Sequence, residues 1–151
     1  MDPDVRRHCA TLEDQHWWYE YRRRIILPFV ERIMTKHKKN LIVDIGCGTG
    51  GTVNYLSNDY RCIGFDQSEV SIKIAREKYP QSQFICGSNF NFLKKFAPET
   101  NLYLLMDVIE HIEDEQKFLS NLIAIARPGA HILITVPVSY THLTLPTKRI
   151  V

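Results

Sequence analysis

A glycine-rich segment at residues 44–50, with the sequence DIGCGTG, constrains the fold of this chain more than any other feature. It follows a short, almost continuous apolar run at residues 41–45 and precedes a helical pattern at residues 49–57. Glycines at such a place let the backbone turn sharply and approach a ligand closely. The start of the next helix offers unpaired N–H groups to an anionic group. The segment therefore predicts a strand, a loop and a helix at the ligand-binding edge of an open α/β sheet.

The rest of the chain alternates strands with helices. Further strands are expected at residues 61–65, 82–86, 102–106 and 131–136, and helices at residues 69–79, 90–96 and 113–126. This alternation predicts βαβ units, a parallel sheet and right-handed crossovers. Residues 11–39 have a helical pattern, and Pro28 is expected to kink or divide the helix that they predict. One face of the helix at 113–126 is expected to carry its apolar residues, which are Phe118, Leu119, Leu122, Ile123 and Ala126.

Two acidic residues accompany the glycine segment. Asp66 follows Gly46 by twenty residues and ends the second strand, where a carboxylate can accept hydrogen bonds from both hydroxyls of a ribose. Asp44 lies inside an apolar strand and needs polar partners, either the N–H groups of the loop or the ammonium of a cofactor. A dinucleotide site is the competing interpretation, and the GxGxG spacing of Gly46, Gly48 and Gly50 makes it the less favoured one. An empty strand–helix turn is the remaining structural interpretation.

Four motifs together resemble the class I S-adenosylmethionine-dependent methyltransferases. VDIGCGTG resembles their motif I, GFDQS their acidic second-strand motif, and LLMDVIEHI with RPGAHILITVP their fourth- and fifth-strand region. The opening HWWYEYRRR resembles the type 11/12 group of that superfamily. The resemblance covers residues 12–137. It implies a Rossmann-like sheet with strand order 3-2-1-4-5-7-6, S-adenosylmethionine as cofactor, and methyl transfer to a small-molecule acceptor.

The resemblance also assigns cofactor-binding roles to individual positions. Residues implied at the methionine end are Asp44, Gly46, Cys47, Gly48 and Gly50. Asp66 is implied at the ribose, and Gln67, Ser88 and Asn89 at the adenine, although Ser88 stands where the family often carries an aspartate. Residues implied to close over the cofactor after the fourth strand are Met106, Asp107 and Val108.

The segment after the fourth strand has three interpretations. His111 is the candidate general base, needed only if the acceptor arrives protonated. Asp107, Glu110 and His111 also partly resemble the divalent-metal set of some quinone-pathway O-methyltransferases, and oxygen and imidazole ligands suit such an ion. The third interpretation is a polar loop that lies on the cofactor side and caps the next helix, with Glu113 and Asp114 near the helix N-terminus.

The aromatic and basic opening has two interpretations. His16, Trp17, Trp18 and Tyr19 are candidates for a lid over the cofactor or the acceptor, and the three arginines at residues 22–24 could meet an anionic acceptor. Alternatively, the aromatic rings pack the helix onto the sheet and the arginines are solvated.

The end of the chain departs from the family pattern. Residues 138–147 match the translation of a transposase sequencing adapter, so residues 138–151 are expected to be a non-native tail. The expected division is then a helical cap at 1–40, a cofactor-binding core at 41–137, and the tail. In the family, strands six and seven follow the fifth strand, and the tail is expected to stand in their place. The fifth strand would then be an open apolar edge prone to aggregation, and the fragment is expected to be weakly active or inactive.

Charge and composition exclude several classes of function. A net charge of +2 is too small to favour nucleic acid or an acidic membrane as partner, and no Asn/Asp-Pro-Pro-Tyr/Phe motif follows the fourth strand. The four cysteines form no CxxC pair, the first ten residues are charged, and no apolar run is long enough for a membrane span. A cytoplasmic enzyme is expected, and its oligomeric state is not assigned. The alternatives are a nicotinamide-dependent oxidoreductase, for which no Tyr-x-x-x-Lys pair is recognisable, and a non-catalytic nucleoside-binding module.

Overall fold

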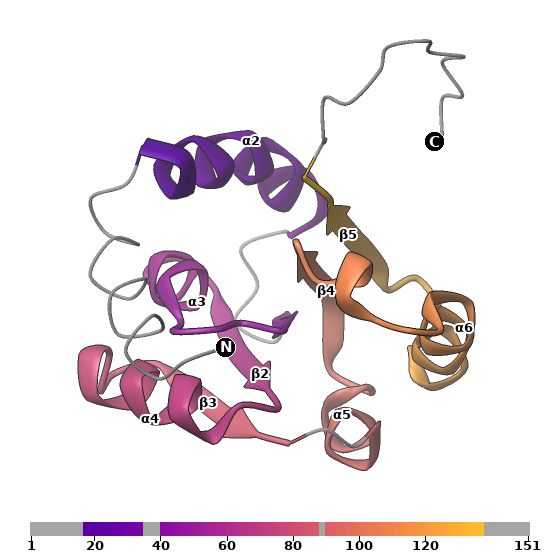
Figure 1. Cartoon of the computed structure of the whole chain (residues 1–151). Coiled ribbons are helices and arrows are strands. Elements are labelled where there is room, and N and C mark those ends of the chain that lie inside the picture. Colours follow the sequence, from indigo (N-terminus) through magenta and orange to yellow (C-terminus); the bar gives the residue numbers. More distant parts are fainter. Residues whose placement is uncertain (1–16, 35–39, 88–89, 138–151) are drawn as a thin grey trace, which may run out of the picture.

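The computed structural model of the chain describes residues 17–34, 40–87 and 90–137. Their centre is a five-stranded parallel sheet (Figure 1). Its strands are β1 (Leu41–Ile45), β2 (Arg61–Asp66), β3 (Gln83–Cys86), β4 (Thr100–Met106) and β5 (His131–Thr135). The spatial order is β3-β2-β1-β4-β5, and every neighbouring pair is parallel. This confirms the predicted Rossmann-like arrangement and the order 3-2-1-4-5 of its first five strands.

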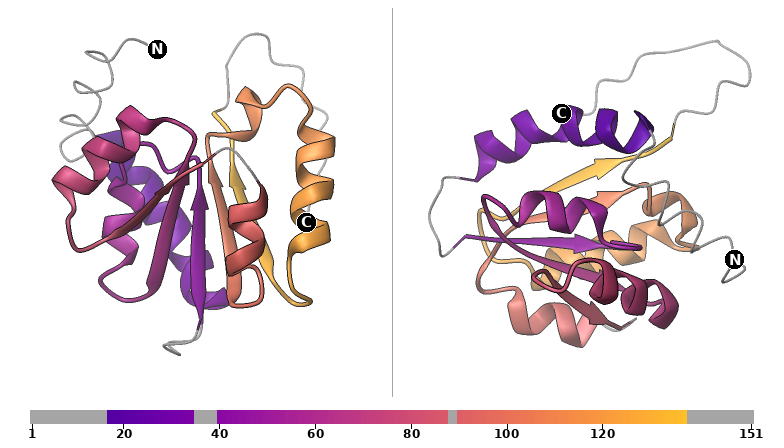
Figure 2. Two further views of the ribbon diagram at one scale, coloured as in Figure 1. Left: turned by 90° about the horizontal axis from the view of Figure 1, so that it is seen from below. Right: turned by 90° about the vertical axis from the view of Figure 1, so that its left-hand side faces the viewer.

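Helices cover both faces of the sheet (Figure 2). One face carries α2 (Trp17–Ile33), α3 (Gly51–Leu56) and α4 (Glu69–Lys78), whose buried side chains pack with Ile42, Leu102 and Leu104. The opposite face carries α5 (Phe90–Phe96) and α6 (Glu115–Ile125), which pack on Val43, Tyr103 and Leu105. A short 3-10 turn, η1 (Ile109–His111), follows β4. Consecutive residues of β4 thus feed opposite cores, as the alternation of side chains along a strand requires.

Several details of the sequence interpretation are wrong. The first helix is not divided at Pro28, because α2 continues through that residue and buries Ile26 and Val30 on either side of it. The helix after the glycine segment begins at Gly51 rather than Thr49, because Gly50 has a left-handed φ of 89° and serves as its N-cap. Ile123 does not face the core: it is 63% exposed, whereas Leu122 beside it is fully buried.

Helix α6 begins at Glu115, directly after its N-cap residue Asp114. The carboxylate of Asp114 accepts a hydrogen bond of 2.9 Å from the Lys117 N–H, which satisfies one of the unpaired donors of the first turn. The predicted start at residue 113 is therefore two residues early. None of the helices in the described ranges is long and apolar enough to cross a membrane.

Candidate functional site

The glycine segment forms a tight loop at the carboxyl edge of the sheet, between β1 and α3. Gly46, Gly48 and Gly50 have φ values of 75°, 56° and 89°, in the left-handed region that favours glycine. The N–H groups of Gly46 and Cys47 both donate to the Phe65 carbonyl, at 2.7 and 2.9 Å, which ties the loop to β2. The predicted loop is therefore present at the place where open α/β sheets bind ligands.

The three glycines differ in what surrounds them. A Cβ atom on Gly46 would lie 2.5 Å from a methyl group of Val108, and one on Gly50 would lie 2.5 Å from the Phe84 ring. A Cβ on Gly48 would meet nothing within 4 Å. The loop is thus packed against the protein at both ends and faces open space at its middle, where a bound group can approach the backbone. This arrangement fits a cofactor of the predicted kind.

Asp66, at the end of β2, braces the loop. Its Oδ2 accepts a hydrogen bond of 2.9 Å from the Gly48 N–H, and its Oδ1 accepts one of 2.8 Å from the Ser68 N–H at the start of α4. The carboxylate thereby links two backbone segments that were not expected to share it. Each oxygen retains a second lone pair, so the predicted contact with a ribose is compatible with this role.

Negative charge gathers under the loop. Asp44 is only 2% exposed. The pKa of the Cys47 thiol is raised well above its usual value, first by burial and then by the nearby carboxylates of Asp44 and Asp66. Burial and the Asp44 carboxylate raise the pKa of the Cys62 thiol in the same way. Two carboxylates at one end of a partly closed site favour a cationic ligand group there.

The residues after β4 meet helix α2. Asp107 has a left-handed φ of 56°, and its carboxylate accepts hydrogen bonds from Arg22 Nη1 at 2.8 Å and from Thr135 Oγ1 at 2.9 Å. Neither interpretation of the arginines describes Arg22, which pairs with a carboxylate of its own chain. Met106 is buried beneath Thr135, and Val108 lies against Gly46. The structure therefore brings together most of the residues predicted to contact the cofactor.

The candidate base His111 and the other two candidate metal ligands, Asp107 and Glu110, do not form a compact cluster. The side chain of His111 is 79% exposed, and its Nε2 is 4.0 Å from a Glu110 oxygen. The Asp107 carboxylate is already engaged by Arg22 and Thr135. Within residues 17–34, 40–87 and 90–137, no three His, Cys, Asp or Glu side chains are arranged to hold a metal ion.

Several predicted residues lie at or beyond the limits of the description. His16, Ser88 and Asn89 are outside the described residues. Trp17, Trp18 and Tyr19 form the first turn of α2, but their side chains are not among those described. Gln67 is exposed beside Asp66, and its carbonyl lies 3.8 Å from the Cys86 thiol.

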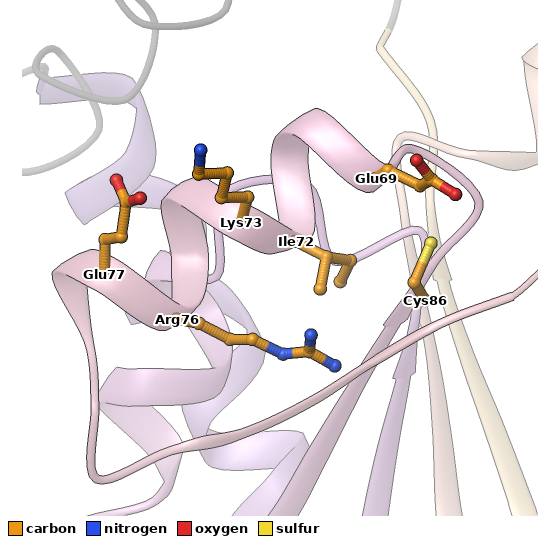
Figure 3. Close-up of a pocket in the computed structure, with 6 residues that line it drawn as sticks. All are labelled: Glu69, Ile72, Lys73, Arg76, Glu77 and Cys86. Carbon is orange, nitrogen blue, oxygen red and sulfur yellow. The ribbon is translucent and has the colours of Figure 1, made fainter.

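A shallow groove of about 540 Å³, the α4 groove, lies along α4 and the end of β3, and no residue of the glycine loop lines it. Figure 3 shows the six residues that line it, which are Glu69, Ile72, Lys73, Arg76, Glu77 and Cys86. None of them is a predicted cofactor residue. The Arg76 guanidinium donates to the Phe84 carbonyl at 2.8 Å, so this side chain has a structural partner. The loop and its carboxylates, which offer backbone donors and charge, remain the better candidate site.

Comparison with known proteins identifies the family. A family model described as "Methyltransferase domain" matches residues 17–149. The chain belongs to this methyltransferase family. Norajmaline N-methyltransferase of Rauvolfia serpentina is 34% identical over 119 residues, which are 74% of this chain and 39% of that protein. The chloroplastic tocopherol O-methyltransferase of Arabidopsis thaliana is 30% identical over 111 residues, covering 69% of this chain and 31% of that enzyme.

A solved structure shows the same fold as this methyltransferase domain. The N-methyltransferase NodS of Bradyrhizobium japonicum, in complex with S-adenosyl-L-homocysteine, superposes with a TM-score of 0.64 at 16% identity. The match covers 81% of this chain and 63% of NodS. By contrast, the matches to the norajmaline and tocopherol methyltransferases span less than two fifths of the length of each of those two proteins. Nothing in these matches supports the nicotinamide-dependent alternative.

Proposed function

We propose that this methyltransferase domain binds S-adenosylmethionine at the glycine loop and acts in methyl transfer to a small-molecule acceptor. The observation that supports this most is the combination of the loop with Asp66 at the end of β2. Gly48 faces open space while its N–H is held by the Asp66 carboxylate. A nucleoside with a cationic amino-acid tail suits a site with backbone donors at its centre and carboxylates at its edge.

Each side of the site would contact a different part of the cofactor. Asp44, Gly46, Cys47, Gly48 and Gly50 would hold the methionine end, where the Asp44 and Asp66 carboxylates supply negative charge. Asp66 would accept hydrogen bonds from the ribose, and Gln67 would lie beside the adenine, together with Ser88 and Asn89. Met106, Asp107 and Val108 would close the site from the end of β4.

The protein's own contribution to the reaction is mainly orientation. The sulfonium of the cofactor supplies an already activated methyl group. The chain would hold the acceptor in line behind that methyl and exclude water. His111 lies on η1 just beyond β4 and is exposed, so it could take a proton from an acceptor that arrives protonated. Whether the acceptor atom is oxygen, nitrogen or carbon is left open, since the two curated relatives are named as N- and O-methyltransferases.

We also propose that the enzyme works in the cytoplasm. The described cysteines Cys47, Cys62 and Cys86 are free thiols, and the first two are buried in the core. Reduced buried thiols are typical of proteins in a reducing compartment.

Calorimetric titration of the purified chain with S-adenosylhomocysteine and, separately, with NADH tests the donor site. We expect S-adenosylhomocysteine to bind and NADH not to bind. Asp66→Ala should weaken the binding of S-adenosylhomocysteine by roughly 10- to 100-fold, because hydrogen bonds to a charged group are lost. Asp59→Ala, which changes an exposed aspartate near β2, is the matched control and should leave binding unchanged. Binding of NADH instead, or equal effects of the two substitutions, would contradict the proposal.

A further inference from the structure

One ion pair joins helix α2 to the candidate cofactor site. Arg22 Nη1 lies 2.8 Å from Asp107 Oδ2, across 85 residues of sequence, and the two side chains are only 14% and 21% exposed. The pair between Arg24 and Glu20 on the same helix is 2.7 Å long, but its side chains are 76% and 62% exposed. Since exposed pairs contribute little, Arg22 is the arginine whose loss should affect the site.

Asp107 is held in an uncommon conformation. It is the first residue after β4 and the only non-glycine residue with positive φ within the described ranges. Its N–H donates to the Thr135 carbonyl at 3.0 Å, and Thr135 Oγ1 donates to its Oδ1 at 2.9 Å. A left-handed aspartate is tolerated when surrounding bonds fix it. Arg22 supplies the bond to the second carboxylate oxygen.

The residue after Asp107 touches the glycine loop. Val108 lies so close to Gly46 that a Cβ there would be 2.5 Å from its Cγ2 atom. The backbone angle of Asp107 therefore determines whether Val108 packs on the loop. A contiguous path of contacts runs from Arg22 through Asp107 and Val108 to Gly46.

We propose that Arg22 is a positioning residue of the cofactor site. By holding Asp107 in its left-handed conformation, Arg22 fixes Val108 against Gly46 and closes the methionine end of the site. The ion pair thereby slows the departure of a bound nucleoside. This last consequence rests on the proposed function, whereas the positioning of residues 107 and 108 does not.

The first test measures the dissociation rate of S-adenosylhomocysteine from the full chain by stopped flow. Arg22→Gln should accelerate dissociation roughly tenfold, because Asp107 and Val108 would no longer be held against the glycine loop. Arg22→Lys, which keeps the charge, should recover part of the loss, and Arg24→Gln should stay within about twofold of the parent chain. In an Asp107→Asn background, where asparagine still tolerates the left-handed conformation, Arg22→Gln should have no further effect.

A second test needs no ligand. Hydrogen exchange of the Asp107 amide, which donates to Thr135, should become about tenfold faster in Arg22→Gln, while the amide of Val43 in β1 stays protected. Equal acceleration at both amides, or none at either, would overturn the positioning role. If Arg22→Gln does not fold, the same comparison between Arg22→Lys and Arg24→Gln decides. If the parent chain does not bind S-adenosylhomocysteine, the proposed function fails, and the exchange at Asp107 still tests the role of Arg22.

Discussion

Strands β1 and β5 have the same length and lie in the same parallel sheet, yet their surroundings are opposite. Every residue of β1 is buried, and no residue of β5 is. β1 lies between β2 and β4 and is covered by helices on both faces, whereas β5 pairs with β4 alone among the described strands. Ile134 of β5 is 39% exposed, and Val136 just after it is 53% exposed.

The difference in burial between β1 and β5 divides this methyltransferase domain into two parts, one around each strand. The part around β1 contains the glycine loop, Asp66 and Val108, and both of its faces are packed by described helices. The part around β5 leaves apolar side chains uncovered, and α6 adds Ile123 to them. Because the chain spans 39% and 31% of two curated relatives, we expect acceptor recognition to depend on regions additional to those described.

The largest difference in unfolding free energy is expected between alanine substitutions of two glycines with positive φ, Gly50 in the part around β1 and Gly129 in the part around β5. Gly50→Ala adds a Cβ 2.5 Å from the Phe84 ring and 3.1 Å from the Ala75 Cβ, at a φ of 89°. We expect it to cost roughly 3 kcal/mol of unfolding free energy, from backbone strain and overpacking together. Gly129→Ala, at a φ of 81° before β5 with nothing within 4 Å, should cost about 1 kcal/mol. Urea unfolding measures both, and equal costs would contradict the comparison.

A second pair of substitutions removes the same atoms from each strand. Ile42→Ala in β1 empties a fully buried position and should lower the unfolding free energy by about 3 kcal/mol. Ile134→Ala in β5 removes a side chain that is partly in water and should cost less than about 1 kcal/mol. A cost at Ile134 as large as that at Ile42 would mean that β5 is buried in solution, for example by self-association.

The buried thiols near β1 should make stability depend on alkaline pH. The pKa of Cys47 is raised above its ordinary value of 9.0, so the thiol stays protonated in the folded chain under conditions where it ionises in the unfolded chain. Stability should therefore be intact below pH 9 and fall as pH rises from there towards the folded-state pKa, by up to about 1.4 kcal/mol per pH unit. Cys47→Ala should remove the part of this dependence that comes from Cys47 and leave the part from Cys62, as urea unfolding at a series of pH values would measure. An unchanged slope would show that the thiol is not shielded.

The smallest change in stability is expected on the exposed edge, where the effect should appear in solubility instead. Ile134→Lys should alter the unfolding free energy by less than about 1 kcal/mol while reducing self-association, because charge on an open apolar strand opposes pairing with another chain. Sedimentation velocity over a concentration series measures this. Val70→Lys, which changes an apolar residue of α4 that is 41% exposed, is the matched control and should not reduce self-association.

The sequence predicts the part around β1 well because its signals are local. The apolar run of β1 and the helix at residues 90–96 have the predicted bounds, and the glycine loop lies between strand and helix as expected. These elements depend on patterns within a few residues. Asp66 also lies at the predicted place, but its bond to the Gly48 N–H depends on how two loops meet in space and has no signal in the spacing.

The features that the sequence does not reveal depend on tertiary contacts. The pair of Arg22 with Asp107 requires the rotation of α2 about its axis, and the sequence offers three consecutive arginines with no means of choosing among them. Pro28 is tolerated inside α2 because Ile26 and Val30 are anchored in the core. Ile123 follows the helical pattern of buried residues, yet only the position of α6 against the sheet decides that Leu122 points inward and Ile123 does not.

We propose that S-adenosylmethionine binds at the glycine loop of this chain. Titration of the ¹⁵N-labelled chain with S-adenosylhomocysteine, followed by backbone amide shifts, tests it most directly. We predict saturable shifts at residues 46–50, 66–68 and 106–108, with none at Arg76 and Glu77 of the α4 groove or in β5. Saturable shifts confined to the α4 groove, or a folded chain with no shifts at all, would contradict the claim.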